Sequence, residues 1–233
     1  MKKQIVVLSG AGMSEESGIS TFRDNNGLWN SYDVMQVAHI DSWHVNQNLI
    51  LQFYNDRRRQ LASVSPNIGH QIIAELEKDF NVVVITQNID NLHERAGTSH
   101  IIHLHGELTK ACSSKDRNKR HVIDIGYNDI LPGDLSVDGS QLRPFIVWFG
   151  EDVPEIEKAF IAISKADIII VVGTSMRVYP AASLIHYAHA DAVIYLIDPA
   201  EINVSIINDV EVIRKKASEG LAFLKKQFYK KYF

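Results

Sequence analysis

Short runs of aliphatic residues recur along the chain, separated by longer segments in which apolar residues return at helical spacing. The runs are rich in isoleucine and valine, and several show no alternation of apolar and polar positions. Such runs are typical of strands that are buried on both faces of a parallel sheet. They predict strands at Ile5–Leu8, Val82–Ile85, Ile101–Leu104, Phe145–Val147, Ile168–Val172 and Val193–Ile197.

Helices are predicted between these strands, because several segments open with proline or serine and continue with apolar residues on one face. The predicted helices cover residues 46–63, 65–78, 154–164, 181–190 and 218–228. This alternation of strands and helices predicts an α/β fold with a Rossmann-like, doubly wound parallel sheet.

Two segments interrupt this pattern and predict a smaller inserted domain. Residues 112–142 carry a cluster of charged residues followed by glycines and a proline, and residues 21–45 are too aromatic for a solvated linker. We therefore expect a single domain over residues 1–233. Its Rossmann-like core would comprise about residues 1–20, 65–111 and 143–233, with small-domain parts at about residues 21–64 and 112–142.

The composition argues against several classes of protein. The 233 residues include 24 Lys and Arg against 28 Asp and Glu, so the net charge is 24 − 28 = −4, and nucleic acid is not expected as a partner. The single cysteine, Cys112, allows neither an intrachain disulfide nor a zinc site made of cysteines alone. The apolar runs are shorter than an export signal or a membrane span requires, so we expect a cytoplasmic protein without a membrane partner.

Small polar and glycine residues follow several predicted strands. Ser9–Gly12 directly follows the first strand, where glycines let the backbone approach a pyrophosphate at the start of the next helix. The match to the G-x-G-x-x-G fingerprint is incomplete because Glu15 replaces the third glycine, so a simple tight turn is the alternative. Gly173–Ser175 and Asp198 follow two other strands, and ligands bind at the carboxyl ends of parallel strands.

Amide, acid and histidine side chains follow two neighbouring strands. Asn88 and Asp90 could simply cap the next helix, or one of them could recognise a carboxamide, which needs both a donor and an acceptor. Strand alternation places His103 and His105 on one face. A His-x-His pair could indicate a metal, but the sequence shows no third ligand nearby. His105, which precedes Gly106 at the strand end, is the better candidate for a general base near neutral pH.

Together these motifs resemble those of the sirtuins. They occur in the sirtuin order and span residues 10–180. The motifs are Gly10–Ile19 with Phe22 and Arg23, Gln87–Asp90, His105 with Gly106, Trp148–Glu151, Gly173–Ser175 and Val178–Pro180. The resemblance implies a Rossmann-like domain with a smaller inserted domain. It also implies NAD-dependent removal of acyl groups from lysine, which would yield nicotinamide, free lysine and O-acyl-ADP-ribose.

The resemblance implies roles for individual residues. Asn88 and Asp90 would hold the nicotinamide carboxamide, Ile89 would lie against its ring, and Phe22 would screen the reacting ribose from water. His105 would take a proton from a ribose hydroxyl, so His105 and Asn88 are the expected catalytic residues. The residues expected to bind NAD are Gly10, Ala11, Gly12, Ser14, Phe22, Arg23, Trp29, Gln87, Asn88, Ile89, Asp90, Gly173, Thr174, Ser175, Asp198 and Ala217.

The resemblance further implies that an acyl-lysine protein substrate binds as an added strand between two segments of the chain, through main-chain hydrogen bonds. Such pairing contacts the backbone and therefore gives broad peptide specificity. The residues expected to contact the substrate are Tyr54, Arg57, Val147, Trp148, Phe149, Gly150, Glu151, Val178 and Tyr179.

The predicted helix at residues 46–63 bears on the acyl group. At about 100° per residue, Arg57 falls in the middle of an apolar stripe that contains Phe53, with Tyr54 at the edge and Arg58 at an intermediate position. A guanidinium there needs an anion, which could be an internal carboxylate. Tyr54 and Arg57 also resemble the Tyr-x-x-Arg of sirtuins that remove succinyl, malonyl and glutaryl groups, as does Thr21, where most sirtuins carry Asp.

The chain departs from the sirtuin pattern at the zinc site. Most sirtuins bind zinc with two cysteine pairs, whereas here Cys112 occupies the first position and the other three cysteines are missing. His121 and Asp124 do not complete a tetrahedral site at a usual spacing, so we expect no zinc. The module would instead be held by its apolar residues, which are Val122, Ile123, Ile125, Tyr127, Ile130 and Leu131.

The adenosine end of the cofactor site departs from the pattern too. Sirtuins usually place Asn near the ribose where this chain has Asp198, which we expect to take over ribose binding. Ala217, at the start of the last helix, is expected near the adenine. Two alternative functions stay open: an NAD glycohydrolase or ADP-ribosyltransferase, and a non-catalytic NAD-binding module. The presence of His105, Asn88 and Asp90 together disfavours the second.

Overall fold

The computed structural model describes residues 2–21, 32–115, 121–174, 181–200 and 210–233. Within them, six strands form one sheet in the order β3-β2-β1-β7-β8-β9, and every neighbouring pair is parallel. The strands are β1 (Gln4–Ser9), β2 (Asn81–Thr86), β3 (Ile101–His103), β7 (Ile168–Val172), β8 (Val193–Ile197) and β9 (Val210–Ile213). The predicted α/β class with a doubly wound parallel sheet is confirmed.

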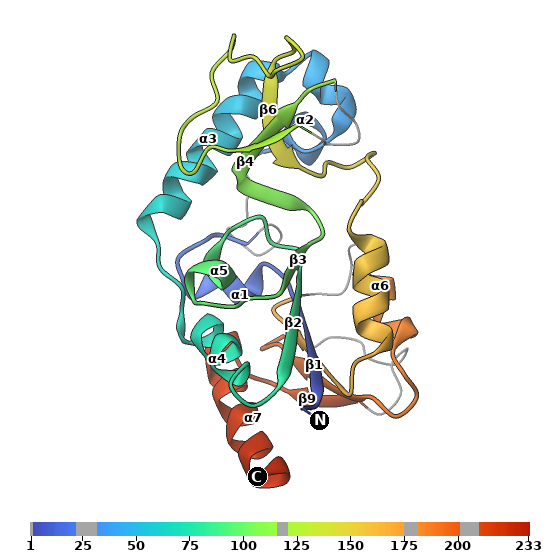
Figure 1. The fold of residues 1–233 in the computed structure, drawn as a ribbon. Helices are drawn as coiled ribbons and strands as arrows, with labels where there is room; N and C mark the ends of the chain where they lie inside the picture. The colour runs from blue at the N-terminus through green and yellow to red at the C-terminus, as the bar shows by residue number, and fades with distance from the viewer. Residues whose placement is uncertain (1, 22–31, 116–120, 175–180, 201–209) are drawn as a thin grey trace.

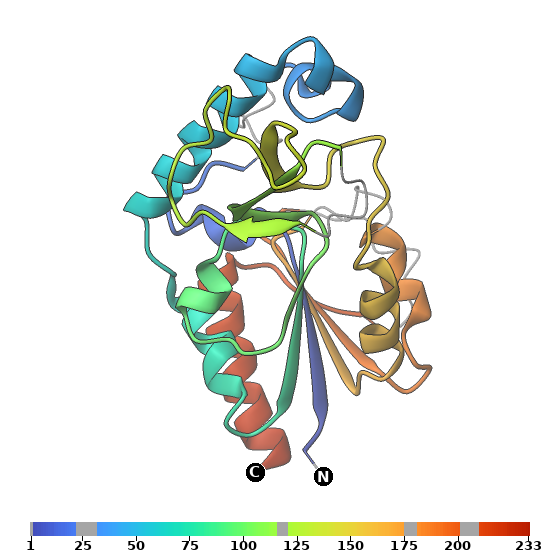
Figure 2. The same ribbon diagram turned by 45° about the horizontal axis from the view of Figure 1, so that its top comes forward.

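Helices cover both faces of this sheet, as Figures 1 and 2 show. In β1, Ile5 and Val7 pack into one core cluster, whereas Val6 and Leu8 pack into another on the opposite face. The first cluster includes residues of α4 (Ile68–Leu76) and α7 (Ala217–Tyr232), and the second includes residues of α6 (Ile156–Ser164) and η3 (Ala181–Tyr187). The central strands β1, β7 and β8 are therefore buried on both faces, which explains their unbroken apolar runs.

The strand order reverses beside β1. The chain runs from β1 outward to β2 and β3, and then returns to place β7 on the other side of β1. Connections on the two sides therefore leave the sheet in opposite directions. In open α/β sheets the ligand crevice lies at such a point, which here is at the carboxyl ends of β1 and β7. The one-turn helix α1 (Gly12–Glu15) follows β1 at this crevice, and α5 (Leu92–Arg95) follows β2.

A second, smaller sheet lies at the end of the molecule opposite the two termini (Figure 1). It is antiparallel, in the order β5-β4-β6, and packs with a helical segment around a separate core cluster. Its elements are β4 (Gly106–Ser113), β5 (Val122–Asp124), β6 (Leu142–Ile146), α2 (Val34–Val37), η2 (Ile40–His44) and α3 (Gln47–Ser63). The expected boundary between the core and the small domain lies between residues 111 and 112, but β4 spans it. The small sheet therefore begins at Gly106, directly after His105.

Two local predictions were wrong, and three strands were missed. The run predicted at residues 145–147 belongs to β6, which pairs antiparallel with β4 and takes no part in the parallel sheet. The helix predicted at residues 181–190 is a 3-10 helix that ends at Tyr187. The strands β4, β5 and β9 were missed, because β4 mixes polar residues with apolar ones, β5 has only three residues, and β9 is short and includes Glu211.

Several apolar residues expected to hold the inserted module (residues 112–142) together are exposed. Ile130 is buried in the small-domain core and Ile125 packs against it, but Ile123, Tyr127 and Leu131 are exposed. Hydrogen bonds hold much of the module instead: Asn55 bonds to both backbone groups of Ile130, and Ser113 donates to Asp138. In the described part of the chain, no helix is both long and apolar enough to cross a membrane.

Candidate active site

Three strand ends meet at the crevice and bond to one another. The backbone N–H of Gly10 donates to the carbonyl oxygen of Val172 at 3.1 Å, and that of Gly12 donates to the carbonyl oxygen of Gly173 at 2.9 Å. The side-chain amide of Gln87 donates to Oγ1 of Thr174 at 3.0 Å. The structure thus brings together the predicted residues that follow β1, β2 and β7.

The glycines at this crevice are required by contact between the two turns. A Cβ on Gly10 would lie 2.7 Å from the carbonyl oxygen of Gly173, and one on Gly12 would lie 2.9 Å from its Cα. Gly173 itself has φ +62°, and a Cβ there would lie 2.2 Å from the backbone nitrogen of Met13. The glycine motif therefore serves close packing of backbone on backbone, whatever the turns bind.

The prediction that the helix after β1 offers several N–H groups to a phosphate needs correction. α1 is only one turn long, and the backbone N–H groups of Gly10, Gly12, Met13 and Ser14 already donate to carbonyl oxygens of the protein. Ala11 is the residue of this turn whose N–H donates to no described backbone group. The short helix results from the sharp return of the chain at Gly18, which has φ +93°.

Ser14 joins Asn88 to Asp90. Nδ2 of Asn88 donates to the carbonyl oxygen of Gly10 and to Oγ of Ser14, both at 3.0 Å, and Ser14 Oγ donates to Oδ2 of Asp90 at 2.8 Å. These bonds orient the Asn88 amide with its nitrogen toward the protein, and no described group donates to its Oδ1. A carbonyl oxygen of fixed position is thereby available to a ligand.

Asp90 is buried and its two carboxyl oxygens have different partners. Oδ1 accepts from the backbone N–H of Leu92 at 3.1 Å, as a helix cap does, and Oδ2 accepts from Ser14. Burial raises the pKa of Asp90, and the bonds from Leu92 and Ser14 only partly offset it. The bond from Leu92 supports the capping hypothesis, and contact of Asp90 with a ligand amide remains a prediction.

His105 lies next to this loop. Its Nδ1 is 3.0 Å from the carbonyl oxygen of Gln87. A carbonyl oxygen only accepts, so Nδ1 carries the proton, and in the neutral ring Nε2 then carries the lone pair of a base. The carbonyl oxygen of His105 accepts from the N–H of Val147, which ties the candidate base to the predicted substrate segment.

His103 lies on the same side of the chain and contacts the neighbouring carbonyl. Its Nδ1 is 3.2 Å from the carbonyl oxygen of Asn88, and its Nε2 is 2.6 Å from Oε1 of Glu94. The sequence offered no third metal ligand, but the side-chain atoms of Glu94, His103 and Glu107 come within 4.8 Å of one another. Hydrogen bonds account for this cluster, since Glu107 pairs with Lys110 at 2.7 Å.

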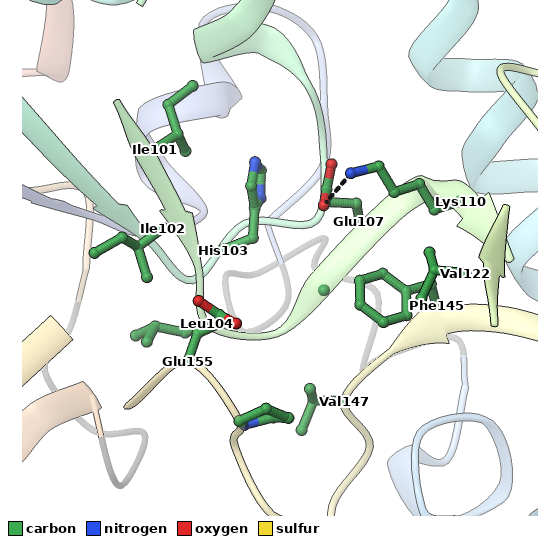
Figure 3. Close-up of a pocket in the computed structure, with 12 residues that line it drawn as sticks. Ile101, Ile102, His103, Leu104, Glu107, Lys110, Val122, Phe145, Val147 and Glu155 are labelled. Carbon is green, nitrogen blue, oxygen red and sulfur yellow. Dashed lines mark hydrogen bonds and ion pairs between the residues drawn. The ribbon is translucent and has the colours of Figure 1, made fainter. Parts of the chain in front are cut away.

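A cavity of about 310 Å³ opens beside His103, between β3 and the small sheet (Figure 3). Figure 3 shows the ion pair of Glu107 and Lys110 on one side, with Phe145 and Val147 on another. His105 does not line this cavity, so we distinguish it from the site built on residues 87–90.

The predicted substrate segment at residues 147–151 is already tied to the protein through much of its backbone. The N–H of Phe149 donates to the carbonyl of Ala38, and the carbonyl of Phe149 accepts from Ile40. Glu151 does not point to solvent: its carboxylate accepts from the N–H of Trp148 and from both terminal nitrogens of Arg143. Gly150, with φ +87°, closes this turn against the side chain of Ile40.

The α3 side chains required a correction to the predicted helical face. Arg58, placed at an intermediate position by the sequence, is fully buried, whereas Arg57 is half-buried and Tyr54 is 3% exposed. Arg58 Nε donates to the carbonyl of Leu108 and its Nη1 to Oδ1 of Asn55. Packing of β4 and the module against α3 shifts the buried arc, and burial lowers the pKa of Arg58 to about 10.

Residues 10–180 match the model of the Sir2 family, well over half of the chain. The chain belongs to the Sir2 family. A relative from Bacteroides thetaiotaomicron, named NAD-dependent protein deacylase, is 57% identical over 226 residues, which are 96% of this chain and 97% of that protein. At such identity and coverage, we identify the chain as a Sir2-family enzyme.

Solved structures of the Sir2 family superimpose on the whole chain. The crystal structure of a Sir2 homologue in complex with NAD has a TM-score of 0.87 and 37% identity, covering 98% of this chain and 90% of that one. A Sir2 variant with a deacetylated p53 peptide and 3′-O-acetyl ADP-ribose has a TM-score of 0.81 and 28% identity, covering 97% and 94%.

Some residues expected to bind NAD or substrate in this Sir2-family chain lie outside the described residues. They are Phe22, Arg23, Trp29, Ser175, Val178 and Tyr179. Two others have protein partners: Oδ1 of Asp198 accepts from the N–H of Ala200 at 2.8 Å, and Ala217 is 5% exposed within the core cluster. Their contacts with the ribose and the adenine remain predictions.

The position where sirtuins carry zinc holds a buried cysteine in this Sir2-family chain. Cys112 lies in β4 opposite Val122 of β5. It is not part of the cluster of potential ligands identified among the described residues. Asp124 caps a local turn by accepting from the N–H of Gly126. One thiol does not provide the donor set of a structural zinc site.

Sequence reasoning missed a buried polar network beneath the loop at residues 87–90. Oγ of Ser9 donates to Oγ1 of Thr86 at 2.9 Å and lies 3.0 Å from Nε2 of His93, while the N–H of Asn88 donates to Oγ1 of Thr86 at 3.0 Å. Hydroxyl residues at the last position of two adjacent parallel strands were the available signal. Together with Glu94, this network supports the loop that holds Asn88.

Proposed function

We propose that this Sir2-family enzyme uses NAD to remove acyl groups from protein lysines, yielding nicotinamide, free lysine and O-acyl-ADP-ribose. We further propose that it prefers acyl chains ending in a carboxylate, such as succinyl and malonyl, and retains deacetylation. The observation that carries this preference is a pair of donors one turn apart on α3: the buried phenol of Tyr54 and the guanidinium of Arg57.

The hydroxyl group of Tyr54 can act as a hydrogen-bond donor. Its hydroxyl oxygen accepts from Nε1 of Trp148 at 3.0 Å, so the O–H of the phenol is directed elsewhere. Burial raises the pKa of Tyr54, and the phenol stays protonated at any working pH. A protonated phenol donates a hydrogen bond to a carboxylate and gives none to a methyl group.

Within the described residues, Arg57 has no partner of the kind that the alternative interpretation, an internal salt bridge, requires. Its Nε is buried without a hydrogen-bond partner among the described residues, and no described carboxylate lies within ion-pair distance. By contrast, Arg59 pairs with Asp56 and Asp129. A carboxylate carried by the substrate would satisfy the guanidinium, and such charge-assisted bonds are stronger than neutral ones.

When bound, NAD would supply a ribose that carries nicotinamide as a leaving group. No side chain of the protein can supply such a group. The polar groups at residues 87–90 suit its carboxamide: Asn88 Oδ1 would accept from the amide nitrogen, and Asp90 offers a carboxyl group that its raised pKa brings closer to protonation. His105, with Nδ1 committed to the Gln87 carbonyl, would accept a ribose hydroxyl proton on Nε2.

The protein substrate would bind as a strand along residues 147–151. Because the N–H groups of Val147, Trp148, Phe149 and Glu151 already have acceptors in the protein, the pairing would use the N–H of Gly150 and the carbonyl of Val147. Neither group has a described backbone partner. The p53-peptide complex of a Sir2 relative supports a peptide site in this fold.

The deciding experiment is one peptide carrying acetyl-, succinyl- or malonyl-lysine, assayed with and without NAD. We expect turnover only with NAD, and a higher kcat/KM for the acidic acyl groups. Arg57→Met should lower kcat/KM for succinyl-lysine by about 10- to 100-fold, the loss of a charged hydrogen bond, and change acetyl-lysine by less than about twofold.

Arg59→Met is the matched control, because Arg59 lies two residues away and pairs with carboxylates of the protein. It should leave both activities unchanged. Equal loss of both activities in Arg57→Met, or intact desuccinylation, would overturn the acyl preference. Release of free ADP-ribose without O-acyl-ADP-ribose would favour the glycohydrolase or ADP-ribosyltransferase alternative.

A further inference from the structure

His103 is held at both ring nitrogens by oxygens. Its side chain is 9% exposed, with Nδ1 at 3.2 Å from the Asn88 carbonyl and Nε2 at 2.6 Å from the Glu94 carboxylate. A carbonyl and a carboxylate only accept hydrogen bonds, so the ring satisfies both oxygens only when both nitrogens carry a proton. The contacts therefore describe an imidazolium.

We propose that His103, held as an imidazolium by Glu94, is a positioning residue that fixes the Asn88 backbone for NAD. This inference rests on the proposed role of Asn88 and Asp90 in binding NAD. His103 and His105 hold two successive carbonyls of one loop, those of Asn88 and Gln87. The Asn88 side chain in turn orients Ser14 and, through it, Asp90.

The groups packed around His103 favour its charged form. Glu94 faces it from α5 and Glu107 from β4, where Lys110 partly neutralises Glu107. Burial of the ring opposes the charge, but the hydrogen bond and charge of Glu94, with smaller contributions from Glu107 and the Asn88 carbonyl, outweigh it and raise the pKa of His103.

The remaining titratable neighbours are Asp90 in the loop and His93 on α5. Asp90 is drawn toward its ionised form by the His103 charge, and the same charge helps to keep the buried His93 neutral. When His103 loses one proton, its single remaining N–H can serve only the Asn88 carbonyl or Glu94. The other oxygen then faces a lone pair, and the loop loses one of its restraints.

Glu94→Gln is the informative variant, because a glutamine amide can donate to Nε2 of the neutral ring, so that Nδ1 keeps its proton for the Asn88 carbonyl at every pH. We expect the Kd of the wild type for NAD, measured by calorimetry, to weaken about fivefold between pH 6 and pH 9, the effect of one net hydrogen bond, and the Kd of Glu94→Gln to stay constant. KM for NAD should follow Kd, with kcat changed less.

His103→Gln should weaken NAD binding relative to the wild type at pH 6, because its one amide cannot serve both oxygens as the charged ring does. His100→Gln is the control: His100 is exposed, three residues earlier, and its substitution should change nothing. Parallel losses of kcat, Kd and thermal stability at every pH in Glu94→Gln would indicate a purely structural pair and overturn the proposal, as would an identical pH dependence of Kd in Glu94→Gln and the wild type. A wild type that fails to bind NAD would instead refute the proposed function.

Discussion

Nδ1 of His105 lies 3.0 Å from the carbonyl oxygen of Gln87, and this contact determines which ring nitrogen can act as a base. With Nδ1 protonated, Nε2 is the basic atom. The same loop carries Asn88 next to Gln87, so this hydrogen bond couples the base to the expected NAD contacts. A shift of the loop would disturb both at once.

Replacing His105 should therefore abolish most of the activity without unfolding the protein. We expect His105→Asn to lower NAD-dependent deacylation by about 100- to 10,000-fold, the usual contribution of a general base. Steady-state kinetics with one acyl peptide would measure the loss, and thermal unfolding would verify the fold. His44→Ala, at an exposed histidine of the small domain, should behave as the wild type. A His105→Asn enzyme with wild-type turnover would contradict the assignment.

Asn55 should contribute more to stability than its neighbours on α3. Its Nδ2 donates to the carbonyl of Ile130, and its Oδ1 accepts from the N–H of Ile130 and from Arg58. Asn55→Ala would leave these buried groups unsatisfied and should cost about 2–4 kcal/mol of unfolding free energy. Asp56→Ala removes only an exposed ion pair and should cost less than about 1 kcal/mol. Denaturant titration of both variants measures the difference, and equal losses would contradict this account.

Zinc should not be needed for the fold. The small sheet presents one buried thiol, Cys112, and the module is tied down by Asn55 and by Ser113, which donates to Asp138 at 2.5 Å. We expect substoichiometric zinc in elemental analysis of purified protein and no change in Tm on adding a chelator. One equivalent of zinc per chain, or a chelator-induced fall in Tm, would show that the donor set has been misjudged.

Stability should fall on mild acidification because of His70. The ring is fully buried, its Nδ1 accepts from the N–H of Asn67, and burial lowers the pKa of His70 to about 4. A histidine whose folded pKa lies below its unfolded value, near 6.5, stabilises the native state while neutral. That stability is lost as pH falls from about 6.5 to 4, by roughly 3 kcal/mol in total.

The comparison that isolates this effect is wild type against His70→Gln, because carboxylates titrate in the same range in both proteins. Unfolding free energies at pH 7 and pH 4.5 should differ by about 2–3 kcal/mol more in the wild type than in His70→Gln. An identical pH dependence in the two proteins would place the acid sensitivity elsewhere.

Local pattern predicted most of the large sheet, because strands buried on both faces must be apolar throughout. The runs at β1, β7 and β8 were located to within a residue or two. The small sheet was mostly missed: β4 includes Glu107, Thr109 and Lys110, and antiparallel strands of a thin domain need no continuous apolar run. Its strands form because β4 and β6 pair with each other.

The buried face of α3 was likewise not predicted by the local sequence pattern. A wheel based on apolar residues placed Arg57 at the centre and Arg58 aside, but β4 and the module pack on the Arg58 side. Which side of a helix is enclosed depends on elements distant in sequence. The polar contacts among Asn88, Ser14 and Asp90 were likewise beyond prediction from spacing, although each residue had been singled out.

By itself, the sequence determined the fold class, the identity of the residues at the strand ends and the resemblance to the Sir2 family, because these depend on residue types in order along the chain. Only the tertiary structure decided how the glycine turns pack on each other, that Nδ1 of His105 is protonated, and that Glu94 and Asn88 share the His103 ring. The reason is physical: hydrogen-bond partners and burial belong to atoms brought together across the sheet, and adjacency in the chain does not record them.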